Sequence, residues 1–188
     1  MQGRYRILGG GFELVESFVA AAGPAGWRYF GRVHRADTGE ETYLVDHVVG
    51  LDWTLVRFRM AGADGSEIVA RSGPHGLDVQ VAGPDGGRSL SMPGATEVWS
   101  PSPVSLLVAH RRLGGFGTDA FPAAQIELPS EIRPVQVRIE SAGQVTVRTS
   151  GGAATAERVT VTVGGRAFDA LVRSDLPLRA DGWFELEA

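Results

Sequence analysis

The residues best suited to acid–base chemistry lie in one short segment, Tyr43-Leu44-Val45-Asp46-His47. Imidazole exchanges a proton near neutral pH, so His47 is the strongest candidate for a general acid or base. On a strand, Asp46 would point to the opposite face and could not orient the His47 ring. A carboxylate from another strand would have to do so, and the equally plausible choices are Glu13, Glu97 and Asp169. The alternative is a half-exposed histidine that packs on Tyr43 and does no chemistry.

Aromatic residues suggest a second kind of chemistry, the binding of a ligand that carries both rings and polar groups. Tyrosine and tryptophan present an apolar body with one polar tip, a combination that lines such pockets. Trp27 and Tyr29 would share one face of a strand. The other candidate ligand-binding aromatics are Tyr43, Trp53, which begins another strand, and Trp99, which precedes a proline-rich bend. The same side chains could equally fill the core.

The adjacent residues Arg111 and Arg112 follow the apolar run Val104 to Ala109 and complete the set of candidate ligand-binding residues. If this segment is a strand, the two side chains point to opposite faces, so at most one of them can face a cavity. Its planar guanidinium would suit a carboxylate, phosphate or enolate oxygen on a ligand. Alternatively, both arginines lie at the rim as solvated charges.

The composition removes several other kinds of chemistry. The 188 residues include no Lys, no Asn and no Cys, which excludes lysine Schiff bases, thiolate nucleophiles, iron–sulfur ligation and disulfides. A net charge of −4 provides no basic field for nucleic acid. The histidines are too widely spaced for a metal site, so we expect neither a metal nor a cofactor; they are His34, His47, His75 and His110.

The elements that must position these residues are β-strands. Apolar and polar residues alternate in many short runs, for example Val135–Glu140 and Arg158–Val163, separated by the Asp-Gly and Gly-Gly pairs typical of hairpin turns. We therefore predict an all-β fold, an antiparallel spiral β-roll or half-open barrel, formed as one domain over residues 1–188. The Gly- and Pro-rich stretch from about 114 to 134 is predicted to be a long crossing loop.

The beginning of the chain gives no sign of a membrane span. The stretch Ile7–Ala22 is interrupted by glycines and by Glu13 and Glu16, so it contains neither the apolar region of a signal peptide nor the ~20 apolar residues of a spanning helix. This predicts a cytoplasmic protein.

Four segments carry a resemblance to known proteins: Gly11-Phe12-Glu13-Leu14, residues 39–53, residues 101–113 ending in Arg111-Arg112-Leu113, and Phe168 to Asp175 followed by Asp181-Gly182. In their order they resemble a family of spiral β-roll proteins named for glycolipid binding. More distantly, they are similar to the lipoprotein-carrier-like half-barrels, which include a cofactor-free natural-product enzyme. The resemblance implies two curved antiparallel sheets around an apolar interior, with a glycolipid-like or polyketide-like ligand.

Two functions fit these observations. The first is the binding of a lipophilic or amphiphilic small molecule in the concavity of the roll. The second is a cofactor-independent enzyme, such as a cyclase, lyase or isomerase of a bacterial natural-product pathway, with His47 and Glu13 as its acid–base pair. A buried polar cluster around His47 would favour the enzyme, whereas an apolar cavity rimmed by arginine would favour the binder.

Overall fold

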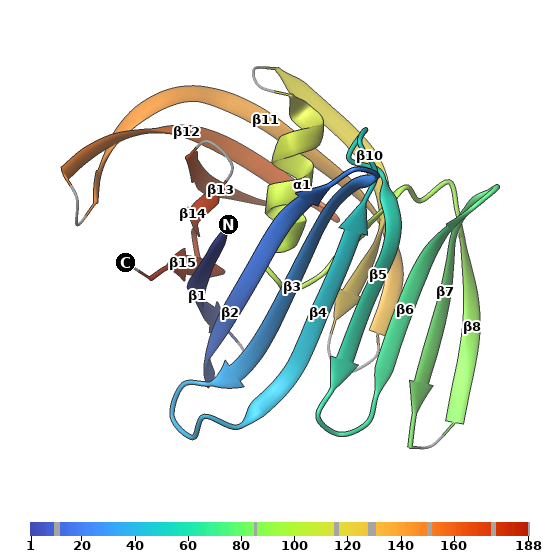
Figure 1. The fold of residues 1–188 in the computed structure, drawn as a ribbon. Coiled ribbons are helices and arrows are strands. Elements are labelled where there is room, and N and C mark those ends of the chain that lie inside the picture. Colours follow the sequence, from blue (N-terminus) through green and yellow to red (C-terminus); the bar gives the residue numbers. More distant parts are fainter. Residues whose placement is uncertain are drawn as a thin grey trace.

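The computed structural model describes residues 1–9, 12–84, 86–114, 117–127, 131–149, 152–173 and 176–187. Of these described residues, 74 % lie in strands and 6 % in the helix, which confirms the predicted all-β class. The strands form one continuous sheet of fifteen, rolled into a half-open, barrel-like shape (Figure 1). The two curved walls implied by the resemblance are therefore two halves of a single sheet.

The first half of the sheet is a meander of sequential antiparallel hairpins. Its strands are β1 (Gln2–Gly9), β2 (Phe12–Gly23), β3 (Gly26–Arg35), β4 (Glu41–Val49), β5 (Leu55–Gly62), β6 (Glu67–Gly73), β7 (Gly76–Gly83) and β8 (Gly86–Pro93). Glycine is required at the start of β3, because Gly26 has φ +145° and a Cβ added there would overlap the carbonyl oxygen of Val49. This close approach sets the position of Trp27, the next residue, at the end of the roll.

The second half of the sheet contains the helix and returns the chain to β1. Its elements are β9 (Glu97–Trp99), α1 (Val104–Leu113), β10 (Thr118–Glu127), β11 (Glu131–Thr149), β12 (Gly152–Val163), β13 (Arg166–Arg173), β14 (Leu176–Ala180) and β15 (Phe184–Leu186). Strand β15 pairs with β1, and β9 pairs in parallel with β10. The order across the sheet therefore runs from β8 through β1 and β15 to β9.

Helix α1 lies inside the roll, between the β1–β5 wall and the β10–β13 wall (Figure 1). The strand expected around Arg111 and Arg112 is therefore wrong. All residues from Val104 to His110 are buried, so the segment lacks the one-sided apolar pattern by which a surface helix is recognised. Its boundary signals were present: Pro103 precedes the first helical residue, and Gly114 ends the helix with φ +67°.

The crossing loop predicted from about 114 to 134 is also wrong over its described part, which contains β10 and the start of β11; residues 115, 116 and 128–130 lie outside the described residues. The prolines stand where a strand lacks a partner on one side. The Pro122 carbonyl accepts a hydrogen bond from the N–H of Thr96, the residue before β9 begins, and Pro134 precedes the stretch where β11 pairs with β12. A proline's missing N–H costs no ladder hydrogen bond at such positions.

The inner face of β1–β3 is packed with aromatic rings. The rings of Tyr5 and Phe18 stack with centroids 5.0 Å apart, and those of Phe18 and Tyr29 stack at 5.1 Å. Such pairs stabilise beyond the area that they bury. Together with the buried residues of α1 they fill the middle of the roll. Within the part of the chain that the structure describes, no helix is long and apolar enough to cross a membrane.

Candidate functional site

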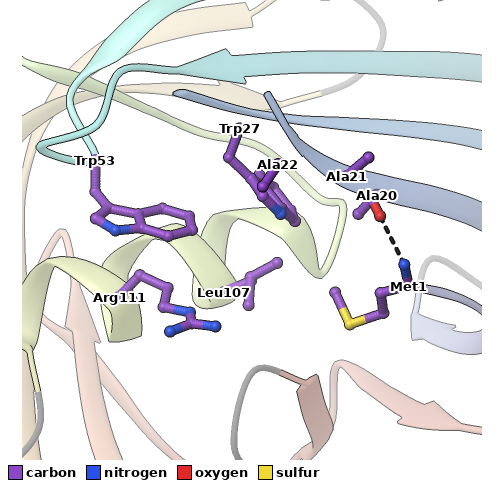
Figure 2. A pocket seen from close by; sticks show the side chains of 8 residues that line it. All are labelled: Met1, Ala20, Ala21, Ala22, Trp27, Trp53, Leu107 and Arg111. Carbon is purple, nitrogen blue, oxygen red and sulfur yellow. Dashed lines mark hydrogen bonds between the residues drawn. The ribbon is translucent and has the colours of Figure 1, made fainter. Parts of the chain in front are cut away.

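A pocket of about 200 Å³ opens at one end of the roll, between the sheet and α1 (Figure 2). It brings together three of the residues predicted to bind a ligand, Trp27, Trp53 and Arg111. The complete lining is Met1, Ala20, Ala21, Ala22, Trp27, Trp53, Leu107 and Arg111. The lining is mainly apolar. Its charged groups are the Arg111 guanidinium and the Met1 α-ammonium, which donates a hydrogen bond to the Ala20 carbonyl at 2.7 Å.

The sheet supplies two indole rings to the pocket. Trp27 comes from the start of β3 and Trp53 from the turn between β4 and β5, and their ring centroids lie 5.6 Å apart with 47° between the ring planes. Trp53 has φ +61°, a left-handed conformation that is unfavourable for a bulky residue. The turn enforces it, because the N–H of Trp53 donates to the Gly50 carbonyl and the N–H of Gly50 donates to the Thr54 carbonyl. The indole is thereby directed over the end of the roll.

The helix supplies the opposite wall. Leu107 and Arg111 are four residues apart and so lie on the same face of α1. In Figure 2 both side chains lie across the pocket from the two indoles. The guanidinium carbon of Arg111 lies 5.2 Å from the centroid of the Trp53 ring, a cation–π contact. This contact holds the arginine head group beside the pocket.

The neighbouring arginine does not reach the pocket. The guanidinium carbon of Arg112 lies 4.2 Å from the centroid of the Phe121 ring, its Nη1 donates to Thr96 Oγ1 at 3.2 Å, and its Nε lies 3.6 Å from Asp119 Oδ2. One arginine of the pair faces the pocket and the other does not, as predicted for a strand. The cause is different, since successive residues on a helix are rotated by about 100°.

His47 belongs to the buried core and not to the pocket. The side chain of His47 is 0 % exposed and that of Glu97 is 1 % exposed. The alternative of a half-exposed histidine is therefore wrong. Nε2 of His47 lies 2.9 Å from Oε1 of Glu97, although the ring is not oriented to make a hydrogen bond to it. The Phe58 ring packs edge-on against the imidazole. Glu97, from β9 on the opposite wall, is thus the carboxylate that meets His47.

Glu13, the partner proposed from the sequence, lies elsewhere. Its carboxylate is half-exposed and pairs with Arg6 at 3.0 Å, so the pairing of His47 with Glu13 is wrong. Asp169 accepts a hydrogen bond from Thr160 in an exposed position. Asp46 lies on the outer face, as expected, where Arg28 binds it through two hydrogen bonds of 2.7 and 3.0 Å.

A second buried carboxyl group, Glu16, was missed by the sequence analysis. Its side chain is 0 % exposed, and Oε1 accepts hydrogen bonds from the hydroxyl groups of Tyr29 and Ser102, both at 2.7 Å. Burial raises the pKa of Glu16 from 4.5 to about 7, with the two hydrogen bonds opposing the rise. Ser102 directly precedes Pro103 and α1, so this cluster joins the helix segment to the sheet. The alternation of β2 contained the signal, since Glu16 stands on the same face as Leu14 and Phe18.

Gly31 makes room for the Glu16 carboxyl group, because a Cβ at this position would overlap Glu16 Oε1. We expect Gly31→Ala to lower the free energy of unfolding by about 1–2 kcal/mol: the carboxyl group must leave its two hydroxyl donors, which outweighs the gain from removing a strand glycine. Urea unfolding measures the difference. Gly23→Ala is the control, since the nearest atom to its added Cβ is 3.9 Å away. Equal effects at the two glycines would contradict the tight fit.

The remaining aromatic candidates lie outside the pocket. Tyr29 is buried and donates to Glu16, and Tyr43 is 1 % exposed within the core. Trp99 packs against Phe168 and Trp183 on the other side of the roll. For these three residues the structure favours the core-filling alternative that the sequence left open.

Comparison with known proteins bears on the fold. No family model matches the sequence, and no curated protein matches it at a significant level. Among solved structures, the chain is similar to a β-barrel-like protein of Domain of Unknown Function DUF1849 from Brucella abortus, with a TM-score of 0.57 over 99 % of this chain and 97 % of that chain. The fold is β-barrel-like. At 10 % identity the likeness concerns the fold alone, so the barrel-like part of the expected resemblance is supported and its glycolipid-binding and carrier features are not.

Proposed function

We propose that this protein binds a small amphiphilic molecule in the pocket between α1 and the ends of β2 and β3. The observation that carries the proposal is the convergence of Trp27, Trp53 and Leu107 on one opening, with the Arg111 head group beside them. Ligand sites are typically concave and apolar with a few placed polar groups. The three hydrophobic side chains come from three separate elements.

The position of the pocket restricts where in the roll a ligand can bind. Residues Val104 to His110 are all buried, so α1 fills the concavity in which a lipophilic ligand was expected. The ligand is accordingly placed at the mouth of the roll, against the face of α1 that bears Leu107. A bilayer-length lipid chain would have to displace the helix, whereas a compact molecule would not.

Binding is supported better than acid–base catalysis. His47 and Glu97 form a buried polar pair, a feature that would favour the enzyme. However, the two side chains are 0 % and 1 % exposed, and neither lines the pocket. Among the eight described lining residues there is no His, Asp, Glu, Ser or Tyr to move a proton. A general acid or base must come within hydrogen-bond reach of the substrate, and the arginine-flanked apolar pocket instead matches the feature that favours a binder.

The test uses a neutral probe, 2-naphthamide, followed by tryptophan fluorescence and calorimetry. Binding is expected to quench fluorescence and raise the melting temperature, because a ligand that binds only the folded state stabilises it. Trp53→Gly should weaken binding at least about tenfold, on the order of the 0.5–1.5 kcal/mol of an aromatic pair plus lost burial. Glycine also accepts φ +61°, so this variant relieves backbone strain at the position it tests.

The matched control is Trp99→Phe, which alters an indole outside the pocket. It should leave the affinity for 2-naphthamide unchanged. Unchanged affinity in Trp53→Gly, or no binding to the wild-type protein, would remove the pocket as the binding site.

A further inference from the structure

The order of the described strands ends at β9 on one side and at β8 on the other, and only the first of these two edges is protected. Strand β9 has three residues, all of them buried. Strand β8 has eight residues, and its one hydrogen-bonded neighbour among the described strands is β7. It lies at the right-hand end of the sheet in Figure 1. An unpaired edge presents a row of backbone N–H and C=O groups to which another strand can bond.

The register of β7 and β8 identifies the outward-facing backbone groups. Just beyond the two strands, the N–H of Gly94 donates to the carbonyl of His75 across the same ladder. In an antiparallel ladder, residue pairs that exchange hydrogen bonds alternate with pairs that do not. The even-numbered residues of β8 therefore bond to β7, whereas Ser89 and Ser91 direct their N–H and C=O groups away from the sheet. Each of the two serines thus offers one donor and one acceptor at the edge.

Strand β8 has few of the features that usually keep an edge strand from pairing. Native edges are commonly interrupted by bulges, prolines or several charges. The register of β8 with β7 runs from Gly86 to Pro93 without a bulge, and Arg88 is the one charged residue of the strand. Pro93, which lacks an N–H, stands at its last position. The serine side chains next to the outward-facing groups are small and exposed, so a second strand can approach to pairing distance.

The strand is complementary to a second copy of itself. If two copies of β8 pair antiparallel about a two-fold axis with Leu90 opposite Leu90, Ser89 of each copy lies opposite Ser91 of the other, and their N–H and C=O groups meet. Leu90 is partly buried against the core and gains a leucine beside it. Arg88 then lies opposite Met92, so like charges do not face each other. A peptide of another sequence would need side-chain pockets for specificity, and the two exposed serines form none.

We infer that two copies of the chain pair through β8 and join their sheets into one continuous sheet across a two-fold axis. The contact consists of backbone hydrogen bonds and the paired Leu90 side chains, which is small beside the ~1,600 Å² of a standard stable interface. The dimer is therefore weak, and its population depends on concentration. Strand β8 contributes no residue to the pocket at the end of the roll, so this inference does not depend on the proposed function.

The experiment on the wild-type protein combines sedimentation equilibrium with amide hydrogen exchange followed by NMR. Concentrations from about 50 µM to about 1 mM cover the affinities of small, transient contacts. We expect the mean mass to rise toward that of a dimer, and the exchange of the Ser89 and Ser91 amides to slow at least about threefold over this range as the open edge becomes paired. The Leu90 amide, which bonds to β7, should be protected at both concentrations.

Three results would overturn the inference. The first is a protein that stays monomeric at the highest concentration. The second is a dimer in which the Ser89 and Ser91 amides exchange as fast as in the monomer, because the contact would then lie on another surface. The third is growth beyond a dimer, because pairing of the same edge about a two-fold axis is closed.

Two double variants test the backbone groups directly. Ser89→Pro/Ser91→Pro removes both outward N–H donors without removing a hydrogen bond to β7, and should weaken the dimer at least about tenfold. Ser89→Ala/Ser91→Ala is the matched control, because it keeps both N–H groups, and it should dimerise as the wild type does. Circular dichroism and the melting temperature show whether each variant is folded. Equal dimerisation of the two folded variants would overturn the pairing through β8, and the exchange measurement on the wild-type protein decides independently of either.

Discussion

The free energy of unfolding is expected to fall by about 3 kcal/mol as the pH rises from 4.5 to above 7, and Glu16→Gln is expected to remove that fall. The native pKa of Glu16 is raised to about 7 from 4.5 by burial. Between these two values the folded chain holds a proton that the unfolded chain has released. The contribution of Glu16 to the free energy of unfolding is thus fully present below pH 4.5 and is lost as the pH rises through 7.

Urea unfolding at pH 4.5, 6 and 8 measures this for the wild-type protein and for Glu16→Gln, and the difference between the two proteins isolates Glu16 from other titrating groups. Gln keeps the size of the side chain and an oxygen that can accept from Tyr29 and Ser102. Glu13→Gln serves as the control, because Glu13 is half-exposed and should leave the pH dependence of the wild type intact. Parallel curves for the wild type and Glu16→Gln would show that Glu16 does not titrate in this range.

Removing the buried carboxylate opposite His47 should have an effect of similar size. We expect Glu97→Leu to lower the free energy of unfolding by about 3 kcal/mol, because a fully buried imidazole loses the polar group that lies 2.9 Å away and the N–H of Val98 loses the oxygen that accepts its hydrogen bond. In the double variant His47→Leu/Glu97→Leu both polar groups are replaced, and the loss should shrink to about 1 kcal/mol.

A double-mutant cycle from chemical denaturation tests this expectation, with a coupling of at least about 2 kcal/mol predicted between the two sites. The pocket offers an internal control, since neither residue lines it. The folded double variant should therefore bind 2-naphthamide as the wild type does. Additive losses at His47 and Glu97 would contradict a paired role in the core, and loss of binding in the folded double variant would reopen the acid–base hypothesis.

The strands could be predicted from the sequence because each is a local pattern. Alternation such as that at Arg158–Val163, and turns such as Gly164-Gly165, whose φ angles are +55° and +85°, depend only on neighbouring residues. Helix α1 could not be recognised in this way. Its buried surroundings remove the polar face, so Val104 to Ala109 has the same composition as a core strand.

For the candidate site as well, the residue types could be recognised from the sequence, but most of the contacts between them could not. Trp27, Trp53 and Arg111 were identified by residue type, but their meeting depends on a helix that crosses the roll and on a left-handed turn at Trp53. His47 was recognised as notable, whereas its partner Glu97 comes from the opposite wall, and no local spacing relates the two. Glu16 could have been found, because a carboxylate at an inward position of an alternating strand is a local signal.

The pocket as a binding site is tested most directly by a crystal structure of the protein with 2-naphthamide. The ring system is predicted to lie against Trp27 and Trp53, with α1 in place. Density for the ligand at another site, or a pocket that stays empty at ligand concentrations that saturate binding in solution, would contradict the account.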